Sequence, residues 1–160
     1  MESILNLKQI LAVDDEPDIL ELLEDEILEA VPSCGFEKAT TYEIATDKLK
    51  SNTYDIVILD IMGVRGFDLL NLAVSRNFKV VMLTAHALIP EAVKQSFERR
   101  ARAYLPKEKL WEIVPFLEDI LRYEYIPGWR GLVEKLKDFF DAKFTPGWEA
   151  KIGLNRRERD

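Results

Sequence analysis

The stretch I-V-I-L-D-I-M at residues 56–62 decides how the rest of this chain is interpreted. Its first four residues are β-branched or leucine, and they lie between Asp55 and Asp60. This is the pattern of a short strand buried on both faces. Strands of that kind belong to parallel sheets covered by helices. A carboxylate at the end of such a strand is either a turn residue or part of a site, and the other strand ends decide between the two.

Short apolar runs and segments of helical periodicity alternate on either side of this strand. Further strands are predicted at residues 9–13, 36–39, 79–83 and 103–105. Helices are predicted from residue 18 to just before Pro32 and at 41–50, 67–76, 90–100 and 108–123. Pro115 lies inside the last helix and should kink or restart it. Five strands alternating with five helices predict an α/β fold with a doubly wound, mostly parallel sheet.

The composition is that of a globular protein with one ordinary domain and a small appendage, because 48% of the 160 residues are hydrophobic and 32% are charged. No apolar run approaches the roughly 20 residues that a membrane span needs, and the N-terminus has no basic region before an apolar stretch. We therefore expect a cytoplasmic protein without a membrane span. One cysteine and one histidine are too few for an internal disulfide or a structural zinc site.

The formal net charge of −7 argues against nucleic acid as a partner, because phosphate contacts need clustered lysine and arginine. The charge is uneven along the chain. Residues 1–124 carry a net charge of −9, whereas residues 125–160 carry +2. The C-terminal part therefore differs in kind from what precedes it.

Polar side chains follow four of the predicted strands. Ligands bind beyond the carboxyl ends of the strands in an open parallel sheet, so these side chains should converge. The residues are Asp14 and Asp15 after the first strand, Asp60 after the third, Thr84 after the fourth and Lys107 after the fifth. Carboxylates gathered in this way repel one another unless a cation holds them, and an all-oxygen site suits Mg²⁺.

A phosphorus centre is the natural target of such a group of side chains. With the ion bound, the Asp60 carboxylate can attack phosphorus while Lys107 offsets charge on the phosphoryl oxygens and Thr84 donates a hydrogen bond. The product would be an aspartyl phosphate.

Four segments in this order and spacing resemble the receiver domains of bacterial two-component response regulators. They are V-D-D-E-P at 13–17, I-V-I-L-D-I-M at 56–62, V-V-M-L-T-A at 80–85 and A-Y-L-P-K at 103–107. The resemblance covers about residues 8–123 and implies a receiver (response regulatory) domain at 1–124 with the flavodoxin-like strand order 2-1-3-4-5.

The resemblance also implies roles for the residues of the site. Asp60 would be the phosphoacceptor, and Asp15, Asp60 and the Met62 backbone carbonyl would bind Mg²⁺ or Mn²⁺. Asp14 would act through a metal-bound water.

A switch is implied as well. Lys107 and Thr84 would contact the phosphoryl group, and Tyr104 would change rotamer when Thr84 moves toward it. This change would alter the face formed by the fourth helix and the fifth strand, as a shift between two populations.

The expected function is two-component signal transduction. The protein would take a phosphoryl group from a histidine kinase or phosphotransfer protein and pass the signal to a downstream protein by binding. It would not be an enzyme beyond its own Mg²⁺-dependent phosphorylation and dephosphorylation. The alternative is a pseudo-receiver that serves as an interaction or dimerisation module without phosphorylation. An aspartate-nucleophile phosphatase is disfavoured, because residues 60–63 do not match the D-x-D-x-T/V pattern of those enzymes.

Two departures from the family pattern bear on the site. The loop at 63–66 is short and lacks proline, and Glu108 stands where a proline commonly follows the lysine. A further hypothesis is that Met62 and His86 flank the site and tune the lifetime of the phosphate.

Residues 125–160 form an extension that repeats Pro-Gly-Trp at 127–129 and 146–148. The apolar positions between the repeats predict one amphipathic helix, and they are Leu132, Val133, Leu136, Phe139 and Phe140. Three coverings of its apolar face remain open: the chain's own receiver, a homodimer partner or another protein. A homodimer would form through the extension or through the face of the fourth helix and fifth strand. The extension is too short for a helix-turn-helix output domain with a linker.

Overall fold

The computed structural model describes residues 2–85 and 90–152, except for the side chains of residues 126 and 127. Its centre is one sheet of five parallel strands in the order β2-β1-β3-β4-β5. The strands are β1 (Gln9–Val13), β2 (Gly35–Ala39), β3 (Ile56–Asp60), β4 (Lys79–Thr84) and β5 (Ala103–Pro106). The predicted fold class and strand order are confirmed.

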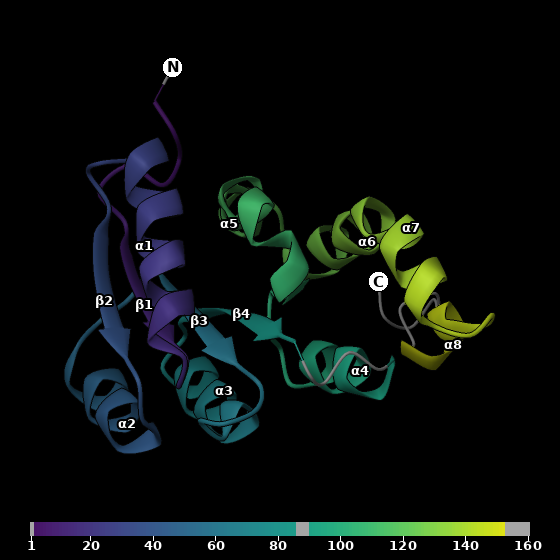
Figure 1. Cartoon of the computed structure of the whole chain (residues 1–160), viewed down its shortest axis with the longest axis horizontal. Helices are drawn as coiled ribbons and strands as arrows, with labels where there is room; N and C mark the ends of the chain where they lie inside the picture. The colour runs from purple at the N-terminus through teal and green to yellow at the C-terminus, as the bar shows by residue number, and fades with distance from the viewer. Residues whose placement is uncertain (1, 86–89, 153–160) are drawn as a thin grey trace.

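Helices cover both faces of the sheet (Figure 1), which is why every residue of β3 is buried. The helices of the receiver part are α1 (Pro17–Ala30), α2 (Tyr42–Ser51), α3 (Gly66–Ser75), α4 (Pro90–Glu98) and α5 (Ile113–Arg122). Helix α1 packs against α5, and α2 packs against α3. None of the described helices is long and apolar enough to cross a membrane.

Local sequence explains where the helices begin. Pro17 opens α1, where its missing N–H costs nothing and its fixed φ suits a helix. The Thr41 hydroxyl caps α2 by accepting a hydrogen bond from the Ile44 N–H at 3.1 Å. The restart predicted near Pro115 is present, because a 3₁₀ helix η1 (Lys107–Glu112) precedes α5 and Lys109 breaks its regularity. Pro115 itself lies in the first turn of α5, where proline is tolerated.

Within the described residues 125–152, the extension folds as three short helices, α6 (Tyr125–Lys135), α7 (Lys137–Lys143) and α8 (Trp148–Ile152). The prediction of one amphipathic helix was therefore wrong, since the helix breaks at Leu136. The break redirects the chain, because α6 lies against β5 and α5 whereas α8 lies against α4. The first Pro-Gly-Trp lies inside α6, whereas the second leads into α8, whose first residue is Trp148.

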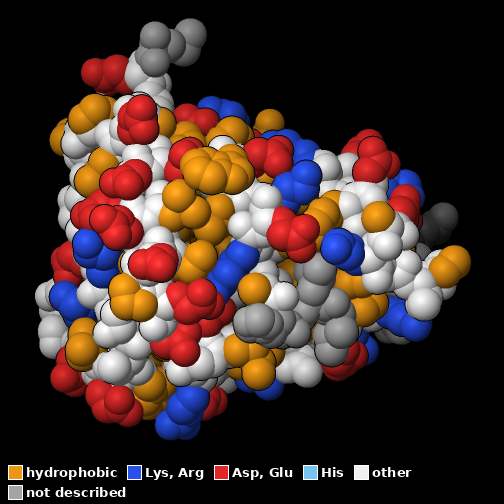
Figure 2. All heavy atoms as spheres, viewed as in Figure 1, with side chains coloured by type: hydrophobic (Ala, Val, Ile, Leu, Met, Phe, Trp, Pro, Cys, Tyr) orange, Lys and Arg blue, Asp and Glu red, His pale blue; other side chains and the backbone are white. Residues whose placement is uncertain are grey.

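The described part of the extension packs against its own receiver domain, which is the first of the three coverings considered above (Figure 1). Charge also separates the two parts. Acidic side chains spread over the side of the molecule that carries α1, whereas both signs mix over the extension (Figure 2).

Candidate functional site

Three carboxylates meet at the carboxyl end of the sheet. Asp14 follows β1 directly, and Asp60 is the last residue of β3, whose Leu59 pairs with Val13. One carboxylate oxygen from each of Asp14, Asp15 and Asp60 lies within 4.8 Å of the others. Asp14 and Asp60 are 0% and 5% exposed, whereas Asp15 is exposed. The predicted convergence is therefore present.

The turn after β1 fixes the first of these carboxylates. Asp14 continues the strand through its N–H, which donates to the Ala39 carbonyl at 3.1 Å. Its Oδ1 accepts a hydrogen bond from the Glu16 N–H at 2.9 Å and so closes the turn that leads into α1. Asp14 therefore has a local structural role and also faces the site.

The loop after β3 brings the backbone close to the carboxylates. Gly63 has φ +81°, and a Cβ at this position would lie 2.5 Å from Asp15 Oδ2. A Cβ at Gly66 would lie 2.2 Å from the Asp60 carbonyl oxygen. The loop that departs from the family pattern is thus a tight turn that depends on glycine at both positions. Met62 lies in this turn with its side chain 53% exposed, and its carbonyl as a metal ligand stays a prediction.

Lys107 reaches the carboxylates from the end of β5. Its Nζ lies 2.9 Å from Asp14 Oδ2, 3.1 Å from Glu16 Oε1 and 3.5 Å from Asp60 Oδ1, with 9% of its side chain exposed. Glu108 in place of proline does not keep the lysine from the site. Burial lowers the pKa of Lys107, but attraction to the carboxylates of Asp14 and Glu16 outweighs that effect and raises the pKa overall.

The cluster carries more negative charge than Lys107 offsets. Burial, followed by repulsion from Asp14, raises the pKa of Asp60 to about 7. Burial likewise raises the pKa of Asp14, although the Glu16 N–H and Lys107 both act to lower it. Asp14 Oδ2 is buried, and its ion pair with Lys107 lacks hydrogen-bond geometry. Buried carboxylate oxygens with spare acceptor capacity fit a hard divalent cation such as Mg²⁺.

A second pair of side chains links the site to β5. Thr84 ends β4, one residue beyond Leu83, which pairs with Asp60. The Thr84 and Tyr104 hydroxyls are hydrogen-bonded, and the two residues are 1% and 0% exposed. Burial holds the pKa of Tyr104 well above its usual range. The hypothesis for His86 falls outside the described residues.

Comparison with protein-family models identifies this arrangement. The model of the response regulator receiver domain matches residues 10–114, which is more than half of the chain. The chain belongs to the response regulator receiver domain family.

Solved structures of receiver domains share the fold. A response regulator protein TrrA from Thermotoga maritima, in complex with Mg²⁺-BeF, is 31% identical, with a TM-score of 0.60 over 71% of this chain and 98% of that one. A putative response regulator from Chloroflexus aurantiacus is 27% identical, with a TM-score of 0.62 over 72% and 98%. A CheY-like receiver domain protein from Methanospirillum hungatei is 25% identical, with a TM-score of 0.59 over 71% and 95%. A comparison with curated protein sequences found no match.

Sequence reasoning missed two contributors to this receiver site. Glu16 forms an ion pair with Lys107 at 3.1 Å, although the sequence V-D-D-E-P had drawn attention only to the two aspartates. Gly63 leaves room for Asp15, and only its place directly after the strand-end segment gave a signal. The residue types that the sequence selected at the strand ends are otherwise brought to one edge of the sheet.

Proposed function

We propose that this receiver domain accepts a phosphoryl group on Asp60 from a histidine kinase or phosphotransfer protein. The observation that carries the proposal is the cluster of three carboxylates, of which Asp14 and Asp60 are buried and paired with Lys107, within a chain of the receiver family. The same family membership supports a role in two-component signalling, a downstream protein target and a cytoplasmic location.

The chemistry follows from the groups around Asp60. One Asp60 carboxylate oxygen forms a bond to phosphorus, and the bond from phosphorus to the donor atom breaks with its electron pair going to the donor. Lys107, 3.5 Å from Asp60 Oδ1, places positive charge where it would offset the negative charge of the phosphoryl oxygens. Thr84 brings a hydroxyl to the end of the neighbouring strand.

A divalent cation completes the proposal. Asp14, Asp15 and Asp60 would hold Mg²⁺ or Mn²⁺, which supplies charge that lets Asp60 stay ionised beside its neighbours. Because Asp60 otherwise holds its proton up to about pH 7, the cation and Lys107 together decide whether the nucleophile is available. We propose no turnover of an external substrate beyond this phosphorylation and its reversal.

The test is incubation with acetyl phosphate, with and without Mg²⁺, followed by intact-mass measurement. We expect a gain of one phosphoryl group that needs Mg²⁺ and disappears in Asp60→Asn. Asp55→Asn is the matched control, because Asp55 lies at the opposite end of β3, where its carboxylate accepts a hydrogen bond from the Gln9 N–H. No gain with any divalent ion would favour the pseudo-receiver instead.

A further inference from the structure

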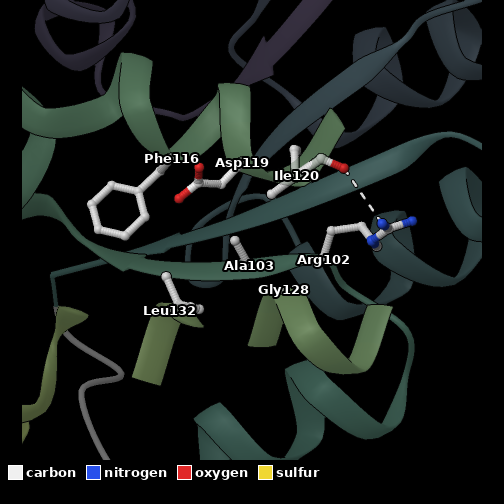
Figure 3. A pocket seen from close by; sticks show the side chains of 7 residues that line it. All are labelled: Arg102, Ala103, Phe116, Asp119, Ile120, Gly128 and Leu132. Carbon is white, nitrogen blue, oxygen red and sulfur yellow. Dashed lines mark hydrogen bonds between the residues drawn. The ribbon is translucent and has the colours of Figure 1, made fainter. Parts of the chain in front are cut away.

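The extension, meaning residues 125–152, covers one continuous surface of the receiver. Helix α6 lies on β5 and α5, and α8 lies on α4. The contact between α6 and the receiver, which we call the seam, is seen in Figure 3. There a small hollow is lined by Phe116 and Ile120 of α5, Ala103 of β5, and Leu132 and Gly128 of α6. We call this surface, made of α4, β5 and α5, the covered face.

Helix α6 is fastened to the covered face by directed contacts. The Trp129 side chain is fully buried, and its indole N–H donates to the Ala101 carbonyl at 2.6 Å. Its ring meets Phe97 of α4 edge to face at 5.4 Å. Lys135 adds an ion pair with Asp119 of α5. Tyr104 is not a partner in any of these three contacts.

Helices α7 and α8 depend on an aromatic cluster instead. Phe140 is fully buried, stacks on Phe144 at 5.0 Å and meets Trp148 edge to face at 5.2 Å. Its ring also lies 6.5 Å from that of Tyr104. Helices of seven and five residues are too short to persist in water by themselves, so this packing holds them. The exposed ion pairs of Lys137 with Asp141 and Glu149 add little.

A chain of contacts therefore joins the strand-end site to α7. Thr84 is hydrogen-bonded to Tyr104, and the Tyr104 ring is tilted against that of Phe140 at 6.5 Å. If the Thr84 hydroxyl turned to a phosphoryl group on Asp60, the Tyr104 hydroxyl would lose a buried partner, which is unfavourable. Since the ring is 0% exposed and interiors are closely packed, a change in the Tyr104 rotamer would displace the neighbouring Phe140 ring as well.

We propose that the extension is the intramolecular partner of the covered face, and that phosphorylation of Asp60 loosens α7 and α8 from it through Thr84 and Tyr104. This inference rests on the proposed function of Asp60. Helix α6 stays docked, because the contacts of Trp129 and Lys135 that hold it do not include Tyr104. Coupling is reciprocal, so a chain whose α7 is already loosened takes up phosphate more readily.

The test measures hydrogen exchange of the full chain with acetyl phosphate and Mg²⁺, with intact mass recorded on the same sample. We expect exchange in peptides from 137–152 to rise at least tenfold on phosphorylation, while peptides from 125–135 stay unchanged. A phosphoryl gain with unchanged exchange at 137–152 overturns the inference and leaves the proposed function standing. Absence of any phosphoryl gain overturns both.

Variants separate the coupling from simple loss of packing. Phe140→Ala should raise exchange at 137–152 before any phosphate is added and increase the phosphorylated fraction severalfold at a fixed donor concentration. Phe139→Ala removes a half-buried ring that meets Phe140 edge to face, so it should have a smaller effect on both than Phe140→Ala. Tyr104→Phe keeps the ring and removes the hydroxyl, so it should be phosphorylated without the exchange response. A full response in Tyr104→Phe would overturn the route through the hydroxyl pair, even if Phe140→Ala failed to fold.

Discussion

The strand-end site and the seam beneath the extension are both largely buried, but the site consists of charged side chains and the seam mainly of apolar ones. The site gathers three carboxylates, two of which pair with the Lys107 ammonium group, and leaves Asp14 Oδ2 without a hydrogen bond. The seam is aromatic and aliphatic, and its buried indole of Trp129 is satisfied by a carbonyl. Buried charge without full compensation weakens a fold, whereas well-packed rings strengthen it. The seam therefore serves stability, and the site gives up stability for chemistry.

The largest effect should come from breaking the seam. Trp129→Ala removes a fully buried indole, and we expect it to lower the free energy of unfolding by about 3–5 kcal/mol. Urea unfolding followed by circular dichroism measures this. Trp111→Ala is the control, because Trp111 is 68% exposed and should change the free energy by less than about 0.5 kcal/mol. Equal effects of the two variants would show that the seam is no part of the stabilising core.

Adding Mg²⁺ should turn the site from a destabilising into a stabilising part of the protein, and so raise the free energy of unfolding. At about 100 times its dissociation constant, an ion that binds only the folded chain raises the free energy of unfolding by about 2.7 kcal/mol. Asp60→Asn should weaken this gain, since it removes one of the three carboxylates. Thermal unfolding over a series of Mg²⁺ concentrations measures the shift. A wild-type midpoint that ignores Mg²⁺ would contradict the metal site.

Without divalent ions, removing a carboxylate should stabilise the protein. The pKa of Asp60 is about 7 in the folded chain against an ordinary 3.8, so the folded state binds this proton more tightly. The resulting stability is present below about pH 4 and is lost as the pH rises through 7. We expect Asp60→Asn to be more stable than wild type at pH 8 by on the order of a few kcal/mol.

The same measurement has a built-in control. At pH 4 the wild-type carboxyl is protonated and resembles the amide, so the two proteins should have nearly equal unfolding midpoints there. A stability difference that does not grow between pH 4 and pH 8 would contradict the raised pKa of Asp60 in the folded chain.

The smallest effect should come from Glu16, at the rim of the site. Glu16→Gln removes one partner of Lys107, but the Glu16 side chain is 52% exposed, so we expect a loss below about 1 kcal/mol. Lys107→Gln should cost more, because it takes the cation from the buried Asp14 carboxylate. Urea midpoints of the two variants, measured without divalent ions, compare them. The reverse order would mean that Glu16 is the principal partner of the lysine.

The strands and their polar ends were predictable, because each depends on a few neighbouring residues. A run such as 56–60 carries its own burial pattern, and parallel strands bring their carboxyl ends together whatever the details. The helix predicted at 41–50 is present as α2 at Tyr42–Ser51, with the Thr41 hydroxyl as its cap.

What could not be predicted depends on contacts between distant parts of the chain. Leu136 has no proline or glycine beside it, so nothing local marks the end of α6, and the break follows from the two surfaces that α6 and α8 reach. The ion pair of Glu16 with Lys107 and the contact of Phe140 with Tyr104 likewise join residues far apart in sequence. Periodicity shows that a face is apolar but not what covers it.

The connection between α5 and α6 is only Tyr123 and Glu124 long. A tether this short keeps the extension at an effective concentration of about a millimolar or more next to the covered face. Any other protein that binds there must compete with a ligand that never diffuses away. Weak binders are excluded while α7 and α8 are docked, so the extension sets an affinity threshold that a partner of the receiver has to exceed.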